Sequence, residues 1–274
     1  MKNLKIGTQI ILATFAIVLI AIFGTAATST YFLRNYITDA TREDALQGLY
    51  ILKNSAEMEM QKVRSFRDHI EQNAVFAMHM ANHEREALLN DMTSLMQGSG
   101  VDVMVAALPD GTVIARGNNR EKYGDYIGDD EIVKRALKGE EVEMMMSGPS
   151  SKLGYYCATP IKRSDGQIVG MIRVAMSFER ESFLDQIKAV FGNEFTVFAG
   201  KTRINTTILE NGKRVTGTDA SEAVQQIVLR DGKDYLTEIE LFGKAYLGAY
   251  SPIKDPSSGK IVGMYFGGQS LETA

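Results

Sequence analysis

The chain has 274 residues, of which 45% are hydrophobic and 23% are charged, and its formal net charge is −4 at pH 7. This length and hydrophobic content are enough for two modest cores and exclude a disordered tail. The single cysteine, Cys157, excludes an intrachain disulfide and a cysteine-rich zinc site. Lysine and arginine form no basic patch and tryptophan is absent, so we predict no nucleic-acid partner.

An uncharged apolar segment follows the basic N-terminus. Residues 6–27, IGTQIILATFAIVLIAIFGTAA, carry no charged side chain, and at about 1.5 Å per residue they are long enough to cross a hydrocarbon core of about 30 Å. Lys2 and Lys5 precede this segment, which favours a cytoplasmic N-terminus. We therefore predict a cytoplasmic stub and a transmembrane helix over residues 1–30, in the inner membrane, with the remainder periplasmic or extracellular.

A cleaved signal peptide is the alternative interpretation of this segment. Gly24 and Ala26 are small residues of the kind found near a cleavage site. The apolar run is nevertheless longer than the usual core of a signal peptide, roughly 7–15 residues. An uncleaved anchor is therefore favoured.

A helical region is predicted over residues 31–100. Proline is absent before Pro109, and apolar residues recur at steps of three and four up to Ala81. The resulting helix, about 75 Å long at 1.5 Å per residue, exceeds what one globular domain needs. It can pack along two stacked domains, pair with a second copy as a coiled coil, or do both with different faces, and we expect a homodimer through it. A break is expected at NHERE from Asn82, before a shorter helix over residues 84–97. The predicted apolar face comprises Leu49, Leu52, Ala56, Met60, Val63, Phe66, Ile70, Ala74, Ala77 and Ala81.

The apolar period becomes that of strands from Val101. VDVMVAAL and TVIAR flank the turn signal PDG, and a polar loop leads to a short helix over residues 130–138. EVEMMMSG, LGYYCATPI and GQIVGMIRVAM then have the composition of three strands. Two antiparallel strands, a helix and a three-stranded meander are the order of a PAS-like sensor fold, which we assign to residues 101–180.

The last part of the chain repeats this order. The hairpin ATPIKRSDGQIVGM returns as YSPIKDPSSGKIVGM, with one extra residue in the turn. Gly139 precedes Pro160 by 21 residues, and Gly232 precedes Pro252 by 20, so the preceding helix keeps its place as well. A second module of the same fold is therefore predicted over residues 181–274.

These features together resemble the double Cache sensor region of bacterial transmembrane receptors, most often methyl-accepting chemotaxis proteins. ARGNNREKYGDYIG and YYCATPIKRSDGQIVGMI are similar to the Arg-containing strand, KxGD loop and hairpin of the membrane-distal module. FTVFAGKTRINTTI and NGKRVTGT resemble the opening strands of the membrane-proximal module. The resemblance implies an α+β fold with an N-terminal transmembrane helix, a long stalk helix and two PAS-like antiparallel-sheet modules in tandem. It also implies signal transduction by ligand binding, without enzymatic activity or a cofactor.

Two features depart from the family pattern. The amino-acid signature of some double Cache domains contains Arg-x-Trp-Tyr, so the lack of tryptophan does not support that assignment. The chain ends at GGQSLETA without a second apolar span or signalling helices, so we expect a fragment of a longer receptor. Its output could be chemotaxis, a histidine kinase or a cyclic-nucleotide enzyme.

The resemblance places the ligand in the membrane-distal module. There Arg173 interrupts the apolar strand IVGMIRVAM, and a buried guanidinium needs a carboxylate, solvent or an anionic ligand. The equivalent residue of the second copy is Phe266, so we expect the first copy to bind and the second to relay. A small anionic ligand such as a carboxylate is predicted, with six candidate binding residues: Arg116, Tyr123, Tyr126, Lys152, Tyr155 and Arg173.

Alternatives to this site remain open. The two arginines could instead form structural ion pairs, with Asp125, Asp129 or Glu143 as partners. His79 and His83 are one helical turn apart, close to Glu84 and Glu86, but a third metal ligand of clear spacing is lacking, which favours an exposed helix face. Cys157 aligns with Ala249 and is expected to be a small buried strand residue, and the MMM sequence at 144–146 is expected to pack in a strand.

A membrane-tethered enzyme lacks a nucleophile and base, whereas a partner-binding ectodomain without a metabolite is the main alternative function.

Overall fold

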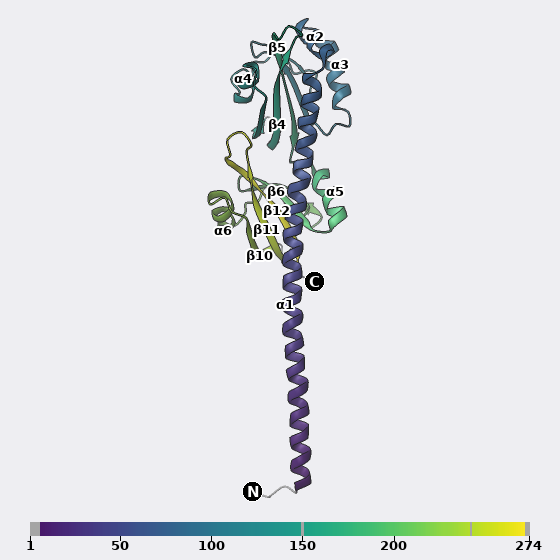
Figure 1. The fold of residues 1–274 in the computed structure, drawn as a ribbon, viewed down its shortest axis with the longest axis vertical. Coiled ribbons are helices and arrows are strands. Elements are labelled where there is room, and N and C mark those ends of the chain that lie inside the picture. Colours follow the sequence, from purple (N-terminus) through teal and green to yellow (C-terminus); the bar gives the residue numbers. More distant parts are fainter. Residues whose placement is uncertain (1–5, 149–150, 242, 272–274) are drawn as a thin grey trace.

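The computed structural model describes residues 6–148, 151–241 and 243–271 (Figure 1). One helix, α1 (Ile6–Glu71), runs along both sheets of the protein, and its N-terminal half extends well beyond them. The predicted cytoplasmic stub lies outside the described residues. Among the residues whose structure is described, no helix is both long enough and apolar enough to cross a membrane. The transmembrane helix predicted for residues 6–27 therefore stays a prediction.

The long helix ends ten residues earlier than predicted. Asn73 breaks it, because its side-chain oxygen accepts hydrogen bonds from the backbone N–H groups of Val75 and Phe76 and so caps a new helix, α2 (Ala74–Ala81). The break predicted at Asn82 is present too, and His83 there has a φ of 57°. It separates α2 from α3 (Arg85–Met96), close to the predicted bounds.

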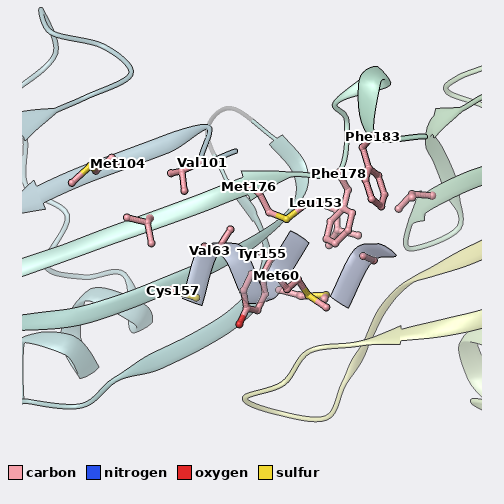
Figure 2. Packing of buried hydrophobic residues seen from close by; sticks show 14 of the residues in the cluster. Met60, Val63, Val101, Met104, Leu153, Tyr155, Cys157, Met176, Phe178 and Phe183 are labelled. Carbon is pink, nitrogen blue, oxygen red and sulfur yellow. The ribbon is translucent and has the colours of Figure 1, made fainter. Parts of the chain in front are cut away.

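The predicted apolar face of α1 packs on both sheets. Leu49 and Leu52 are buried in the part of α1 that runs along the second sheet. Val63 and Ile70 are buried further along the helix, next to the first sheet. Ala74 is exposed, because the helix that carried the predicted period has ended before it. Figure 2 shows part of this core, with Met60 and Val63 of α1 beside strand residues of the first sheet.

The first sheet has the strand order β2-β1-β5-β4-β3, and every neighbouring pair is antiparallel. α1 covers one face, and α4 (Glu131–Leu137) packs on the other. Its strands lie close to the predicted segments: β1 (Val103–Ala107), β2 (Val113–Arg116), β3 (Val142–Gly148), β4 (Ser151–Lys162) and β5 (Ile168–Ser177).

The second sheet has the order β7-β6-β12-β11-β10, which is the order of the first sheet with equivalent strands in equivalent places. A short helix, α6 (Glu222–Val224), continues as the π-helix η1 (Gln225–Arg230) and covers the face that α4 covers in the first sheet. The connecting helix α5 (Glu181–Phe191) precedes it, and a small hairpin of β8 (Leu209–Glu210) and β9 (Lys213–Arg214) follows β7. The main strands are β6 (Glu194–Ala199), β7 (Thr202–Thr206), β10 (Tyr235–Leu241), β11 (Lys244–Lys254) and β12 (Ile261–Ser270).

The repeated IVGM sequence has a steric cause. A Cβ at Gly170 would lie 2.4 Å from the carbonyl oxygen of Ala107 on β1, and a Cβ at Gly263 would lie 2.1 Å from that of Phe198 on β6. Both distances are far below van der Waals contact, so glycine is needed where the central strand of each sheet, β5 or β12, approaches its neighbour, β1 or β6. The two copies therefore share a backbone constraint as well as a pattern of apolar residues.

Phe178 joins the cores of the two sheets. Its ring lies 6.2 Å from that of Phe183 on α5 and 6.3 Å from that of Tyr265 on β12, in edge-to-face arrangements. It is fully buried, and Figure 2 shows it next to Leu153 of β4. The sheets thus share one continuous core along α1.

Gly263→Ala is expected to destabilise the protein, because the added Cβ would collide with the Phe198 carbonyl and the β6–β12 ladder cannot open without losing hydrogen bonds. We expect the free energy of unfolding to fall by about 1–3 kcal/mol, measured by urea denaturation. An unchanged urea midpoint for Gly263→Ala would contradict this account of the repeat.

Candidate ligand-binding site

A cavity of about 240 Å³ lies on the face of the first sheet that α4 covers. Strands β1, β2, β4 and β5 form its floor, and the loop between β2 and α4 forms its walls. Three cationic and two anionic side chains line it, which gives it one excess positive charge. Its polar and aromatic lining includes Arg116, Lys122, Asp125, Asp130, Tyr156 and Arg173.

Strand register brings the two predicted arginines into one row. Val105 of β1 pairs with Arg116 of β2 on one side and with Arg173 of β5 on the other, and Arg173 pairs with Ala158 of β4. Directly paired residues of neighbouring strands have their side chains on the same face. The sheet therefore presents two guanidinium groups across a single valine.

Arg116 is held firmly by the loop that follows it. Its Nη1 and Nη2 atoms donate to the two carboxylate oxygens of Asp125 at 2.6 and 2.8 Å, and Nη1 also donates to the Lys122 carbonyl at 2.9 Å. This bidentate pair keeps the pKa of the Asp125 carboxyl below its ordinary value, chiefly through the Arg116 hydrogen bonds. The ion pair with Asp125 that we considered as an alternative is therefore present, and it fixes the loop over the sheet.

Arg173 is less well satisfied. Its side chain is 6% exposed, and its Nη1 donates to one carboxylate oxygen of Asp130 at 3.0 Å. The guanidinium carbon lies 5.9 Å from the centre of the Tyr156 ring, while the buried Nε has no hydrogen-bond partner. The acid is Asp130, rather than the predicted Asp129 or Glu143, because Asp130 sits at the first turn of α4 over β5. A buried donor without a partner inside a cavity is the kind of group that a ligand can satisfy.

Tyr155 lies on the opposite face of the sheet from this cavity. Its hydroxyl donates to Glu143 at 2.6 Å and accepts from Arg64 of α1 at 3.0 Å, and burial raises its pKa. Its neighbour Tyr156 faces the cavity instead, because consecutive strand residues point to opposite faces. Burial also raises the pKa of Tyr156, so it stays a neutral phenol at pH 7.

The other three predicted residues also lie away from the cavity. Tyr123 is 55% exposed, and its ring stacks with the Arg85 guanidinium at 3.8 Å. Tyr126 is 60% exposed and forms an isolated bridge with Thr112. Lys152 lies near the tip of the β3–β4 hairpin, beside the second sheet. The polar and aromatic residues of the cavity that sequence reasoning missed are Lys122, Asp130 and Tyr156, together with Asn118 and Asn119.

The remaining candidates have ordinary structural roles. Cys157 is fully buried between β4 and α1, and burial raises the pKa of its thiol to about 11. The His79 imidazole contacts Asp91 at 2.9 Å, whereas His83 lies in the exposed turn after α2. Met145 of the MMM sequence is buried, with its neighbours half-buried in β3.

The equivalent space in the second sheet is filled. The row there reads Thr206, Thr196, Phe266 and Tyr250, so Phe266 stands in place of Arg173 and Tyr250 in place of Ala158. The two rings lie 5.0 Å apart and are buried with η1 residues above them. Aromatic side chains thus occupy the volume that the first sheet leaves open.

Asp125→Asn is expected to lower stability in a pH-dependent way. The folded-state pKa of Asp125 is depressed, so its contribution is complete above the unfolded-state value of about 3.9 and is lost as pH falls through the lower folded-state value. The difference in unfolding free energy between wild type and variant should therefore shrink below about pH 4. It should be modest at pH 7, because this carboxylate is 41% exposed.

Urea unfolding between pH 2.5 and 7 measures this difference, with Asp129→Asn as the control because that carboxylate is 86% exposed. A wild-type advantage that stays constant over the whole range would contradict the role assigned to the Arg116–Asp125 pair.

The comparisons with known proteins agree with this architecture. The family model for single Cache domain 3 matches residues 178–274. A comparison with curated protein sequences gives no match. The periplasmic domain of Vibrio cholerae LuxQ is similar in structure, with a TM-score of 0.56 at 13% identity over 82% of this chain and 99% of that one.

Two chemoreceptor domains with bound ligands are similar as well. The ligand-binding domain of Campylobacter jejuni Tlp3, in complex with 4-methylisoleucine, gives a TM-score of 0.59 at 14% identity over 86% of this chain and 93% of that one. That of Pseudomonas fluorescens CtaA, in complex with L-isoleucine, gives 0.53 at 16% identity over 88% and 97%. At such identities the likeness establishes the fold. Residues 178–274 thus match the single Cache domain 3 family, and the chain as a whole shares the fold of these three domains.

Proposed function

We propose that the chain is the extracytoplasmic sensing region of a bacterial transmembrane receptor and that it binds a small molecule with an anionic group in the cavity of the first sheet. The observation that carries this proposal is Arg173, a residue of the cavity lining whose buried guanidinium has one hydrogen-bonded acid and an Nε without a partner. The contrast with the second sheet supports it, since the same position there is Phe266 in a filled core.

The chemistry of the lining favours a carboxylate ligand. Arg116 makes three hydrogen bonds within the loop and Arg173 makes one, so Arg173 and Lys122 are the cations with the most donors left for a ligand. Asp130 offers a half-exposed carboxylate beside Arg173, which could accept an ammonium group. The cavity can therefore hold an anion alone or a zwitterion. The ligands of the similar Tlp3 and CtaA domains, 4-methylisoleucine and L-isoleucine, carry both groups.

The tandem organisation follows the same proposal. We divide the chain into the membrane stub and span (1–30), the helical region (31–100), a membrane-distal PAS-like module (101–180) and a membrane-proximal one (181–274). A continuous α1 would pass from the modules into the membrane and transmit a shift of the sheets. The described apolar side chains of its projecting part support membrane insertion, because Phe15, Ile22 and Phe23 are each more than half exposed.

The same helix supports a homodimer. The face of α1 that turns away from the sheets carries Leu46, Tyr50 and Met58, which are 44%, 65% and 65% exposed. An apolar stripe opposite the packed face is what a helix paired with its copy requires. A chemoreceptor and the histidine kinase DctB both contain sensor domains of similar fold, so the fold is compatible with either output.

A ligand panel tests the binding proposal. Organic acids, amino acids, amines and purines are added to the protein from residue 40 onward, and the melting temperature is recorded. A ligand at 100 times its Kd stabilises the folded state by about 2.7 kcal/mol, a shift of several degrees. We expect Arg173→Met to abolish the shift and Tyr155→Phe, on the opposite face, to retain it.

The results separate the alternatives. A ligand that shifts Arg173→Met as strongly as wild type would rule out the proposed cavity. A panel without any shift would favour the partner-binding ectodomain.

The membrane and dimer proposals are tested together by light scattering in detergent. The full chain is expected to bind a micelle and to have twice the protein mass of one chain, whereas Tyr50→Glu combined with Met58→Glu should give the mass of one chain. A single-chain mass for the wild-type protein at all concentrations would contradict the dimer, and a full chain that stays monodisperse without detergent would contradict the anchor.

A further inference from the structure

The β11–β12 turn, residues 255–260, contacts the first sheet. Asp255 is 4% exposed, and one of its carboxylate oxygens accepts hydrogen bonds from the backbone N–H and hydroxyl of Ser258 at 2.9 and 2.5 Å. The other oxygen accepts from the backbone N–H of Met145 on β3, at 2.8 Å. One buried carboxylate therefore shapes the turn and pairs with the edge strand of the other sheet. We call residues 255–260 the docking turn.

The docking turn also contacts the last turn of α4. The Nη1 atom of Arg135 donates to the hydroxyl of Ser257 at 2.7 Å, while its Nε donates to Glu140 at 2.8 Å. The second bond fixes the guanidinium plane on the first sheet, so the contact with Ser257 has a defined geometry. Figure 1 shows this hairpin tip, in yellow, reaching toward α4.

The other end of α4 belongs to the cavity. Asp130, the residue before the helix, makes no capping bond and gives its carboxylate to Arg173 instead. The helix has seven residues and a length of about 10 Å. A movement of Asp130 when a ligand competes for Arg173 would therefore be carried to Arg135 by a short, rigid element.

The strand that leaves the docking turn packs closely on α1. A Cβ at Gly267 of β12 would lie 2.6 Å from the backbone nitrogen of Leu49 and 3.0 Å from the carbonyl carbon of Gly48. Asn193 adds hydrogen bonds to the Asp44 carbonyl of α1 and to Gln269 of β12. A shift of β12 along its axis cannot be absorbed by side chains at this backbone contact, so it must move α1 or break the packing.

The equivalent turn of the first sheet makes no such contact. There Asp165 is half-exposed, and among the described residues its hydrogen bonds are with its own turn, to Arg163 and Gln167. The two copies thus differ at the point where the second turn has its additional residue. Docking between the sheets is a property of the second copy.

We propose that the docking turn couples the candidate cavity to α1 through a series of contacts. The series runs from Arg173 to Asp130, along α4 to Ser257, and through β12 to α1. For its role in sensing, this inference rests on the proposed function. The mechanical coupling itself is independent of any ligand, so it can be tested on the ligand-free full chain.

Hydrogen exchange with mass spectrometry on detergent-solubilised full chain provides the first test. Asp255→Ala removes the acceptor of the Met145 amide, and exchange at this amide should become about tenfold faster. Asp165→Ala is the matched control in the equivalent turn and should leave Met145 unchanged. Equal exchange at Met145 in wild type and Asp255→Ala would overturn the docking contact. If Asp255→Ala does not fold, Asp255→Asn, which keeps one acceptor oxygen, should show a smaller acceleration.

The second test asks whether the two ends of α4 are coupled. Arg173→Met should change hydrogen exchange in residues 255–260 by about twofold or more, although Arg173 contacts the opposite end of α4 from the docking turn. Ser257→Ala should remove this effect, and Tyr155→Phe should not produce it. If hydrogen exchange in residues 255–260 is the same in Arg173→Met and in wild type, the coupling is overturned. Ligand binding is then judged separately by the melting-temperature panel. Conversely, coupling without any ligand response would contradict the proposed function alone.

Discussion

A single apolar face on α1 is the constraint on which the rest of this protein depends. Each five-stranded sheet packs one face on α1, beside α2 and α3 in the first sheet and beside α5 in the second. Because the helix is continuous from Ile6 to Glu71, both sheets are fixed to the same rigid rod. Phe178 then closes the junction between them, so the protein has one core along its length.

Two buried arginines of the first sheet illustrate how pairing decides the role of a charge. Arg116 is satisfied by both oxygens of Asp125 and a carbonyl, and it holds the loop that forms the cavity wall. Arg173 has a single bond to Asp130 and leaves a buried donor unused. Removing a guanidinium from water costs several kcal/mol unless its donors are engaged. The same residue type is therefore well paired at one end of a strand row and only partly paired two strands away.

The differences between the two copies are as informative as their similarity. Glycine is kept at 170 and 263 because the neighbouring backbone leaves no room for a Cβ. Arg173 and Ala158 of the first sheet are replaced by Phe266 and Tyr250 in the second, which converts a cavity into a filled core. The turns diverge as well, since the second one contacts the other sheet through the buried carboxylate of Asp255, whereas Asp165 in the first turn is half-exposed. One fold thus has a cavity in one copy and a contact surface in the other.

The order of the elements could be read from the sequence. The strand and helix segments after Val101, the long apolar face of α1 and the equivalence of Arg173 with Phe266 all follow from periodicity and from matched spacing around the two hairpins. Local patterns carry this information because side-chain period and turn residues are set by neighbours in the chain. The early end of α1 was missed, since a capping asparagine interrupts a face whose apolar period continues through it.

The composition of the cavity was decided by tertiary structure. The choice between Tyr155 and Tyr156 could not be made from the sequence, because β4 is buried on both faces and its residues do not alternate between apolar and polar. Asp130 became the partner of Arg173 only through the placement of α4 over β5. The docking of residues 255–260 also depends on how the two sheets stack along α1. It joins residues more than 100 positions apart in the chain, and local sequence patterns do not specify such contacts. The sequence by itself determined which segments form strands and helices and that they occur twice, while packing on α1 determined which side chains meet.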